Sequence, residues 1–155
     1  MKLGEALSTR ADIQKRMNRA QALLADNATV QEGDVPAVSP ARLLEEYRRL
    51  AAEHEAIVRK INRTNPRARI EFRDEEMSLA DAVIRRERLA REAGVLRDMA
   101  NRAIPKGSRY LRTEVKHVPT IDIADTLAEA DRLSKEHREL DARIQQANWE
   151  VELSE

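Results

Sequence analysis

The chain contains no cysteine among its 155 residues. This absence excludes disulfide bonds, thiol nucleophiles and thiolate metal sites. Aromatic residues make up 3% of the chain, and there are only four glycines and five prolines. So few aromatic and turn-forming residues argue against a turn-rich β fold and indicate long helices with narrow aliphatic seams. A single helical domain, residues 1–155, is the expectation for this length.

The net charge of the chain is zero, because 28 lysines and arginines balance 28 aspartates and glutamates. The chain as a whole therefore exerts no electrostatic pull on nucleic acid or on an anionic membrane. No stretch approaches the ~18 consecutive apolar residues of a membrane span, and the first residues lack the apolar core of a signal peptide. The sequence predicts a cytoplasmic protein that does not bind membranes.

Four segments carry apolar residues in steps of three and four, which is the period of an amphipathic helix. Ser39 before Pro40 is a typical helix start, and Thr120 or Asp122 can cap the last helix. Helices this long and this one-sided need partners to be stable. The sequence therefore predicts an all-α, antiparallel bundle of four long helices with coiled-coil-like seams. The predicted helices cover residues 2–26, residues 40 to about 62, residues 79 to about 103, and residues 120–153.

Two segments favour extended structure. Residues 67–72 alternate polar and apolar side chains, and residues 109–118 are rich in aromatic and β-branched residues. We expect residues 109–118 to pair with residues 67–72 or with residues 28–31, as a small extended ribbon in the connections. The acidic run of residues 74–76 is interpreted as a solvated loop ahead of the third helix.

Three single residues stand out on the seams. Arg10 occupies a seam position and is expected to reach solvent, with a buried ion pair as the alternative. Gly94 lies inside the third helix, where it suggests the close approach of another backbone. Trp149, the only tryptophan, is expected to be a packed anchor, within the bundle or against another subunit.

Two histidines, His54 and His137, also lie on the predicted seams. A ferritin-like di-metal site needs a glutamate three residues before each histidine, but Ala51 and Ser134 occupy those positions. We therefore expect no metal and no cofactor, and we interpret the histidines as a polar layer that fixes the register of the bundle. The sequence contains no nucleophile elbow and no Gly-rich phosphate loop, so we do not expect an enzyme.

Two polar clusters lie outside the seams, and both mix hydrogen-bonding side chains with cations. Their groups are suited to a phosphate, a carboxylate or an RNA backbone. Alternatively, they satisfy free backbone groups at helix ends, hold the loops or form a subunit contact. The clusters consist of Asn62, Arg63, Thr64 and Asn65 after the second helix, and of Arg109, Tyr110, Arg112 and Lys116 in the second extended segment.

A set of short motifs is spread over most of the chain. They are Met1-Lys2-Leu3, Arg10-Ala11-Asp12, Gln14-Lys15-Arg16, Asn27-Ala28, Val30-Gln31-Glu32-Gly33-Asp34, Ile61-Asn62-Arg63-Thr64-Asn65, Arg109-Tyr110, Glu114-Val115-Lys116, Val118-Pro119-Thr120, Glu139-Leu140-Asp141, Arg143-Ile144-Gln145 and Ala147-Asn148-Trp149. In these motifs the chain resembles small bacterial proteins labelled septicolysin or septicolysin-like. The resemblance implies a helical domain of uncharacterised function without established catalytic residues. The family name suggests a haemolysin, whereas this sequence has neither a secretion signal nor an apolar hairpin or barrel-type strand.

The sequence therefore predicts a non-enzymatic structural or interaction protein that acts as a homo-oligomer. Its alanine-rich seams offer few large residues to bury, and association of copies would supply more buried area. One alternative is a module that binds nucleic acid or a phosphate ligand through the loop arginines. The other is a membrane-active protein, as the family name suggests.

Overall fold

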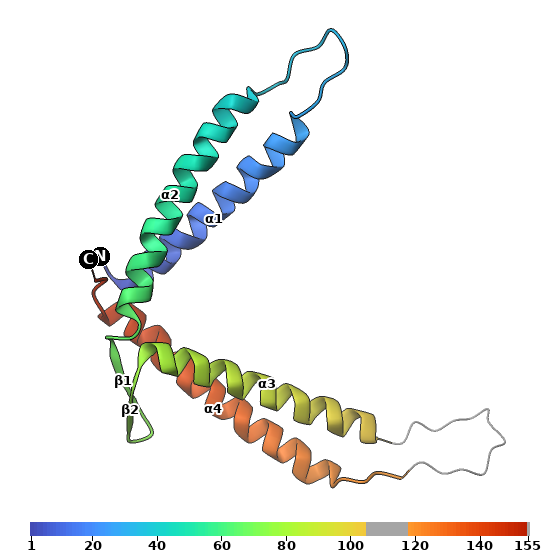
Figure 1. The fold of residues 1–155 in the computed structure, drawn as a ribbon. Coiled ribbons are helices and arrows are strands. Elements are labelled where there is room, and N and C mark those ends of the chain that lie inside the picture. The colour runs from blue at the N-terminus through green and yellow to red at the C-terminus, as the bar shows by residue number, and fades with distance from the viewer. Residues whose placement is uncertain (105–117, 155) are drawn as a thin grey trace, which may run out of the picture. The chain divides into compact units, whose positions relative to one another are not determined.

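Helices and a β-hairpin make up the part of the chain that the computed structural model describes, residues 1–104 and 118–154. This part is mostly helical with a small antiparallel sheet, as predicted. Along the chain the elements are α1 (Leu3–Asp26), α2 (Pro40–Thr64), β1 (Arg69–Phe72), β2 (Glu75–Ser78), α3 (Leu79–Ala103) and α4 (Ile123–Glu150), as shown in Figure 1.

The described chain divides into two compact units. The first unit comprises Met1–Ala68 and Gln146–Glu155, and the second comprises Arg69–Gln145. The boundary at Gln145 falls inside α4, so this helix contributes residues to both units. One bundle of four helices in a single domain stays a prediction, because the structure establishes helix pairs within each unit.

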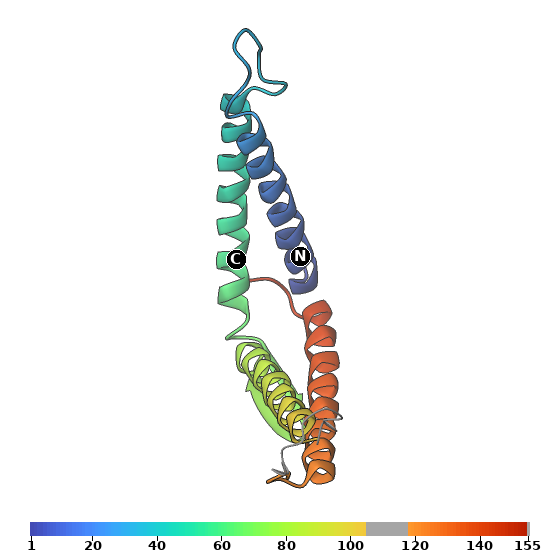
Figure 2. The ribbon, with the colours of Figure 1, turned by 90° about the vertical axis from the view of Figure 1, so that its right-hand side faces the viewer.

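In the first unit, α1 and α2 lie side by side and antiparallel, joined by residues 27–39 (Figures 1 and 2). The predicted seams supply the buried side chains, among them Ile13 and Ala20 of α1 and Leu50 and Ile61 of α2. Arg10 is exposed, so the prediction that it reaches solvent is confirmed. These residues show that the apolar period of each helix faces its neighbour.

The end of α4 differs from its predicted position. The helix ends at Glu150 rather than at Leu153, because the residues that follow pair with the start of the chain. Leu3 N donates to Val151 O at 2.9 Å, and Leu153 N donates to Met1 O at 2.9 Å. Val151 N still donates to Ala147 O at 2.9 Å, but Val151 O and Leu153 N bond to the start of the chain instead of continuing the helix.

Trp149 is a partial anchor for these paired ends. Its indole ring packs against Gly4, where an added Cβ would lie 2.9 Å from the ring. However, 58% of the surface of Trp149 remains exposed. Glycine is therefore required at this position for close contact, although the tryptophan is not buried as fully as a core residue.

A β-hairpin opens the second unit. The strands β1 and β2 are antiparallel, with Arg69 opposite Ser78 and Phe72 opposite Glu75. Arg73 and Asp74 connect them with positive φ angles of 52° and 62°, as in a two-residue type I′ turn. Residues 75–78 were not predicted as the partner of β1, although this local partner needs only two connecting residues. The predicted pairing of residues 109–118 with residues 67–72 or 28–31 stays a prediction. Residues 109–117 lie outside the described residues.

The acidic run was misassigned as well. Glu75 and Glu76 belong to β2, and only Asp74 lies in the turn. Met77 of β2 is buried, and so is Ile70, its partner across the hairpin. Because successive side chains of a strand point to opposite faces, Glu76 lies on the solvent face, whereas Glu75 shares the face of Met77 and is exposed at the turn end of the strand.

The helices α3 and α4 form the second antiparallel pair. Higher residue numbers on α3 meet lower numbers on α4, since Arg86 pairs with Asp141 at 2.7 Å and Arg97 pairs with Asp131 at 3.0 Å. Both views show the two helices side by side (Figures 1 and 2). A Cβ on Gly94 would meet nothing within 4 Å, so the predicted close approach at this glycine is wrong.

Side chains cap the starts of both helices, and the predicted cap of α4 at Asp122 is confirmed. Ser78 Oγ accepts a hydrogen bond from Asp81 N at 3.0 Å, and Asp122 Oδ1 accepts one from Asp125 N at 2.9 Å. Each satisfies an N–H of the first turn that has no helical partner.

Candidate functional site

A buried carboxylate lies at the centre of the second unit. The side chain of Glu136 on α4 is 8% exposed and accepts from two arginines. Arg73 Nη1 donates to Oε2 at 2.8 Å, and Arg85 Nη2 donates to Oε1 at 3.0 Å. Arg73 also binds Glu139 at 2.8 Å, and Arg85 binds Glu75 at 2.6 Å. We call these five residues the Glu136 network.

The network also holds the hairpin against the helices. The guanidinium carbons of Arg73 and Arg85 lie 5.3 and 5.6 Å from the centre of the Phe72 ring, within the range of a cation–π contact. Hydrogen bonds to Glu75 and Glu136 raise the pKa of Arg85, and the hydrogen bond from Arg73 lowers the pKa of Glu139. Every charge in the network has a partner inside it, so the arrangement suits a structural clamp rather than a ligand site.

The two histidines of the predicted polar layer are half-buried. His54 lies on α2 in the first unit, and His137 lies on α4 in the second. Their layer stays a prediction. Within the described residues, no three His, Cys, Asp or Glu side chains are close enough to hold a metal ion.

Glu136, the direct neighbour of His137, was not among the residues predicted from the sequence to form a site. A signal was present, because Glu136 precedes the seam residue Leu140 by one helical turn. A charge at that spacing indicates a buried ion pair. Its partners were not evident, since Arg73 and Arg85 lie 63 and 51 residues away in the sequence.

The first polar cluster lies at the end of α2. Asn62 and Arg63 are exposed and Asn65 is half-buried, whereas Thr64 between them is 2% exposed. Thr64 Oγ1 donates to Lys60 O at 2.8 Å and accepts from Ser154 N at 2.9 Å. This centre of the cluster therefore satisfies backbone groups. The second cluster, Arg109, Tyr110, Arg112 and Lys116, lies outside the described residues.

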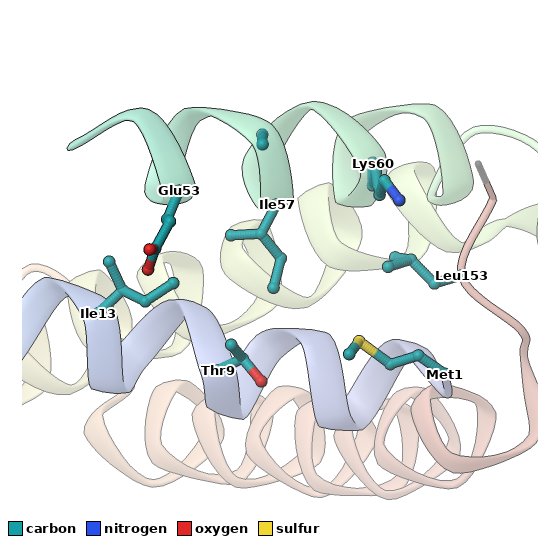
Figure 3. Close-up of a pocket in the computed structure, with 8 residues that line it drawn as sticks. Met1, Thr9, Ile13, Glu53, Ile57, Lys60 and Leu153 are labelled. Atoms are coloured by element: carbon teal, nitrogen blue, oxygen red, sulfur yellow. The ribbon is translucent and has the colours of Figure 1, made fainter. Parts of the chain in front are cut away.

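A cleft of about 470 Å³ opens between α1 and α2 in the first unit. Figure 3 shows Ile57 pointing from α2 toward α1, and Ile13 pointing from α1 toward α2. Glu53 and Lys60 place opposite charges along the α2 side of the cleft. The lining residues are Met1, Thr9, Ile13, Glu53, Ala56, Ile57, Lys60 and Leu153.

The cleft continues along the same side of the helix pair. A second hollow of about 340 Å³ includes Ala20, Leu23 and Leu43 in its lining, and Arg16 and Glu46, 4.0 Å apart, lie at its edge. Steps of three and four residues connect the two linings on each helix, so they share one helical face. We call this combined surface the α1–α2 groove.

The groove has the character of a docking surface for a helix. Its middle is aliphatic and its edges are charged, which is the pattern of grooves that receive an amphipathic helix. It presents no arrangement of nucleophile, base and oxyanion donors. In the described part of the chain, no helix combines the length and the apolar character needed to cross a membrane.

Comparison with known proteins gives a family but no activity. A crystal structure of a functionally unknown conserved protein from Corynebacterium diphtheriae is similar to this chain, with a TM-score of 0.90 and 39% sequence identity over 99% of both chains. A search of curated proteins found no significant match. Residues 10–153 match the family described as "Family of unknown function (DUF6847)", with no reference to septicolysin. The chain belongs to this family of unknown function.

Proposed function

We propose that the chain is a non-enzymatic interaction protein that self-associates through the α1–α2 groove. The observation that carries this proposal is the lining of the groove, in which the half-buried Ile57 and Leu153 leave an aliphatic surface open beside the buried Ile13. A helix pair has wider apolar seams than one partner can cover. A further helix in the groove would remove this surface from water, which is favourable by ~25 cal/mol per Å² of apolar area.

A second copy of the chain is the proposed occupant. The net charge of zero means that copies do not repel one another at neutral pH. The groove also carries both signs of charge, Glu53 and Lys60, so an identical surface can complement it. Self-association would supply the buried area that the alanine-rich seams lack within one chain.

The test is light scattering on protein separated by size exclusion, over a range of concentrations. Ala56→Glu adds a charge to an exposed position in the groove, and we expect it to shift the native oligomer toward monomer. The matched control is Ala11→Glu, which adds the same charge on α1. Ala11 is exposed and two residues from Ile13, so it points away from the groove. A native chain that is monomeric throughout would refute self-association.

The same preparation separates this proposal from its two alternatives. A peak with the ultraviolet absorbance ratio of nucleic acid would favour the binding module with loop arginines. Leakage of dye from vesicles of anionic lipid would favour the membrane activity that the septicolysin resemblance suggests. An oligomer without either property would support the interaction protein.

A further inference from the structure

We infer that self-association is isologous, with α2 of one copy antiparallel to α2 of the second copy and Glu53 of each opposite Lys60 of the other. This inference rests on the proposed function, because it gives the register of the same surface. The observation behind it is that Glu53 and Lys60 lie on opposite sides of the middle of the groove along α2.

The α2 side of the groove, in which Ile57 is half-buried and the other three residues are exposed, is symmetric about one point. Glu53, Ala56, Ile57 and Lys60 follow one another in steps of three, one and three residues. The midpoint between Ala56 and Ile57 therefore lies 3.5 positions from Glu53 and 3.5 positions from Lys60. At ~1.5 Å per residue each charge lies about 5 Å along the axis from that midpoint.

A two-fold axis through this midpoint satisfies both charges at once. In an isologous contact, residue i of one copy meets residue j of the other, and j meets i. Glu53 then meets Lys60 twice, and the small side chain of Ala56 lies beside Ile57 at the axis, where it lets the helices approach. A parallel alignment in the same register would place like charges together, at a cost that the antiparallel alignment avoids.

The ionic state of these residues within one chain fits this register. Among the described residues, the ammonium group of Lys60 has no ion-pair partner. Glu53 is paired with Arg49, the residue one turn earlier on α2, and its side chain remains 44% exposed. A second copy would therefore give Lys60 an ion-pair partner, and Glu53 supplies a carboxylate that remains accessible at the edge of the groove.

The experiment is charge reversal on the full chain, with the dimer dissociation constant measured by analytical ultracentrifugation at low salt. We expect Glu53→Lys and Lys60→Glu each to raise this constant by about tenfold or more, because like charges then face each other twice. The double variant restores opposite charges and should return the constant to within about threefold of the native value. The losses in the single variants should shrink in high salt.

Two matched variants control for effects that are not specific to the groove. Glu55→Lys removes a similar helical ion pair, Glu55–Arg59 at 2.6 Å, and changes the net charge equally. Glu55 is two residues from both Glu53 and Ile57, so it points elsewhere. Lys15→Glu reverses an exposed lysine of α1 outside the groove.

The outcomes separate the register from the proposed function. Weakening by both single variants, restoration by the double variant and unchanged controls would support the register. A native dimer that tolerates the single reversals, or that the double variant fails to restore, would overturn the register and leave self-association standing. Equal weakening by Glu55→Lys would overturn it as well. A monomeric native chain would refute both.

Discussion

Removal of the Glu136 carboxylate should destabilise the protein strongly. Breaking a fully buried ion pair costs about 3–5 kcal/mol, because the remaining charge loses its partner. Here the side chains of Arg73 and Arg85 are 47% and 27% exposed, and each keeps one acidic partner. We therefore expect Glu136→Ala to lower the free energy of unfolding by about 2–3 kcal/mol.

Glu139 provides the matched control for this effect. It accepts from the same arginine as Glu136, Arg73, and at the same 2.8 Å, but its side chain is 41% exposed. An exposed pair contributes about 0–1 kcal/mol, so Glu139→Ala should be nearly neutral. Both variants can be compared in urea by circular dichroism at one protein concentration. Equal losses in the two variants would refute the reasoning, because burial would then make no difference.

Three further changes test other parts of the structure by the same unfolding measurement. Thr64→Val removes the hydroxyl that binds Ser154 N and should cost about 1–2 kcal/mol, whereas Thr64→Ser keeps it and should cost less. Asp74→Gly should raise stability by about 0.5 kcal/mol, because glycine adopts the positive φ of this turn without steric cost; a loss would contradict the assigned turn. The hydrogen bond from Lys2 lowers the pKa of Glu152 in the folded chain. The ionised carboxylate therefore stabilises the fold at pH values above its ordinary pKa. This stabilisation is lost as the pH falls through the lower pKa of the folded state. When the pH falls below about 4.5, the free energy of unfolding of the native chain should therefore decrease more than that of the Glu152→Gln variant. Equal decreases in the two proteins would contradict this.

The helices were predictable because their signals are local. The apolar period placed α1, α2 and α3 within a residue or two of their observed ends, and Asp122 capped α4 as expected. The end of α4 was not predictable in this way. The bonds that release residues 151–153 from the helix come from the other end of the chain.

The hairpin shows a different limit. Its turn residues are Arg73 and Asp74, whereas the sequence signal for a type I′ turn is Asn-Gly or Asp-Gly. The arginine is explained by its bonds to Glu136 and Glu139. Long-range ion pairs thus hold a residue in a backbone conformation that its own preference disfavours, and no local pattern could reveal them.

The sequence did not locate the α1–α2 groove. Apolar seams with few large residues predicted association, and the loop clusters were the predicted ligand or subunit-contact sites. The structure instead assigns the buried member of the first cluster, Thr64, to backbone hydrogen bonds. The groove involves Ile13, Ile57 and Leu153 from three separate segments, and sequence patterns do not show how such segments meet.

The two units carry different features, an internal ion-pair network in the second and an aliphatic groove in the first. In the second unit Arg73, Arg85 and Arg86 all have acidic partners there, so a second copy has little to offer this network. In the first unit an aliphatic groove opens beside Glu53 and Lys60, and a second copy would cover it. Disruption of the Glu136 network should therefore reduce the free energy of unfolding at constant dimer affinity. A charge at Ala56, which is exposed, should weaken association and leave monomer stability nearly unchanged. If Glu136→Ala and Ala56→Glu changed both properties together, the assignment of association to the first unit would be wrong.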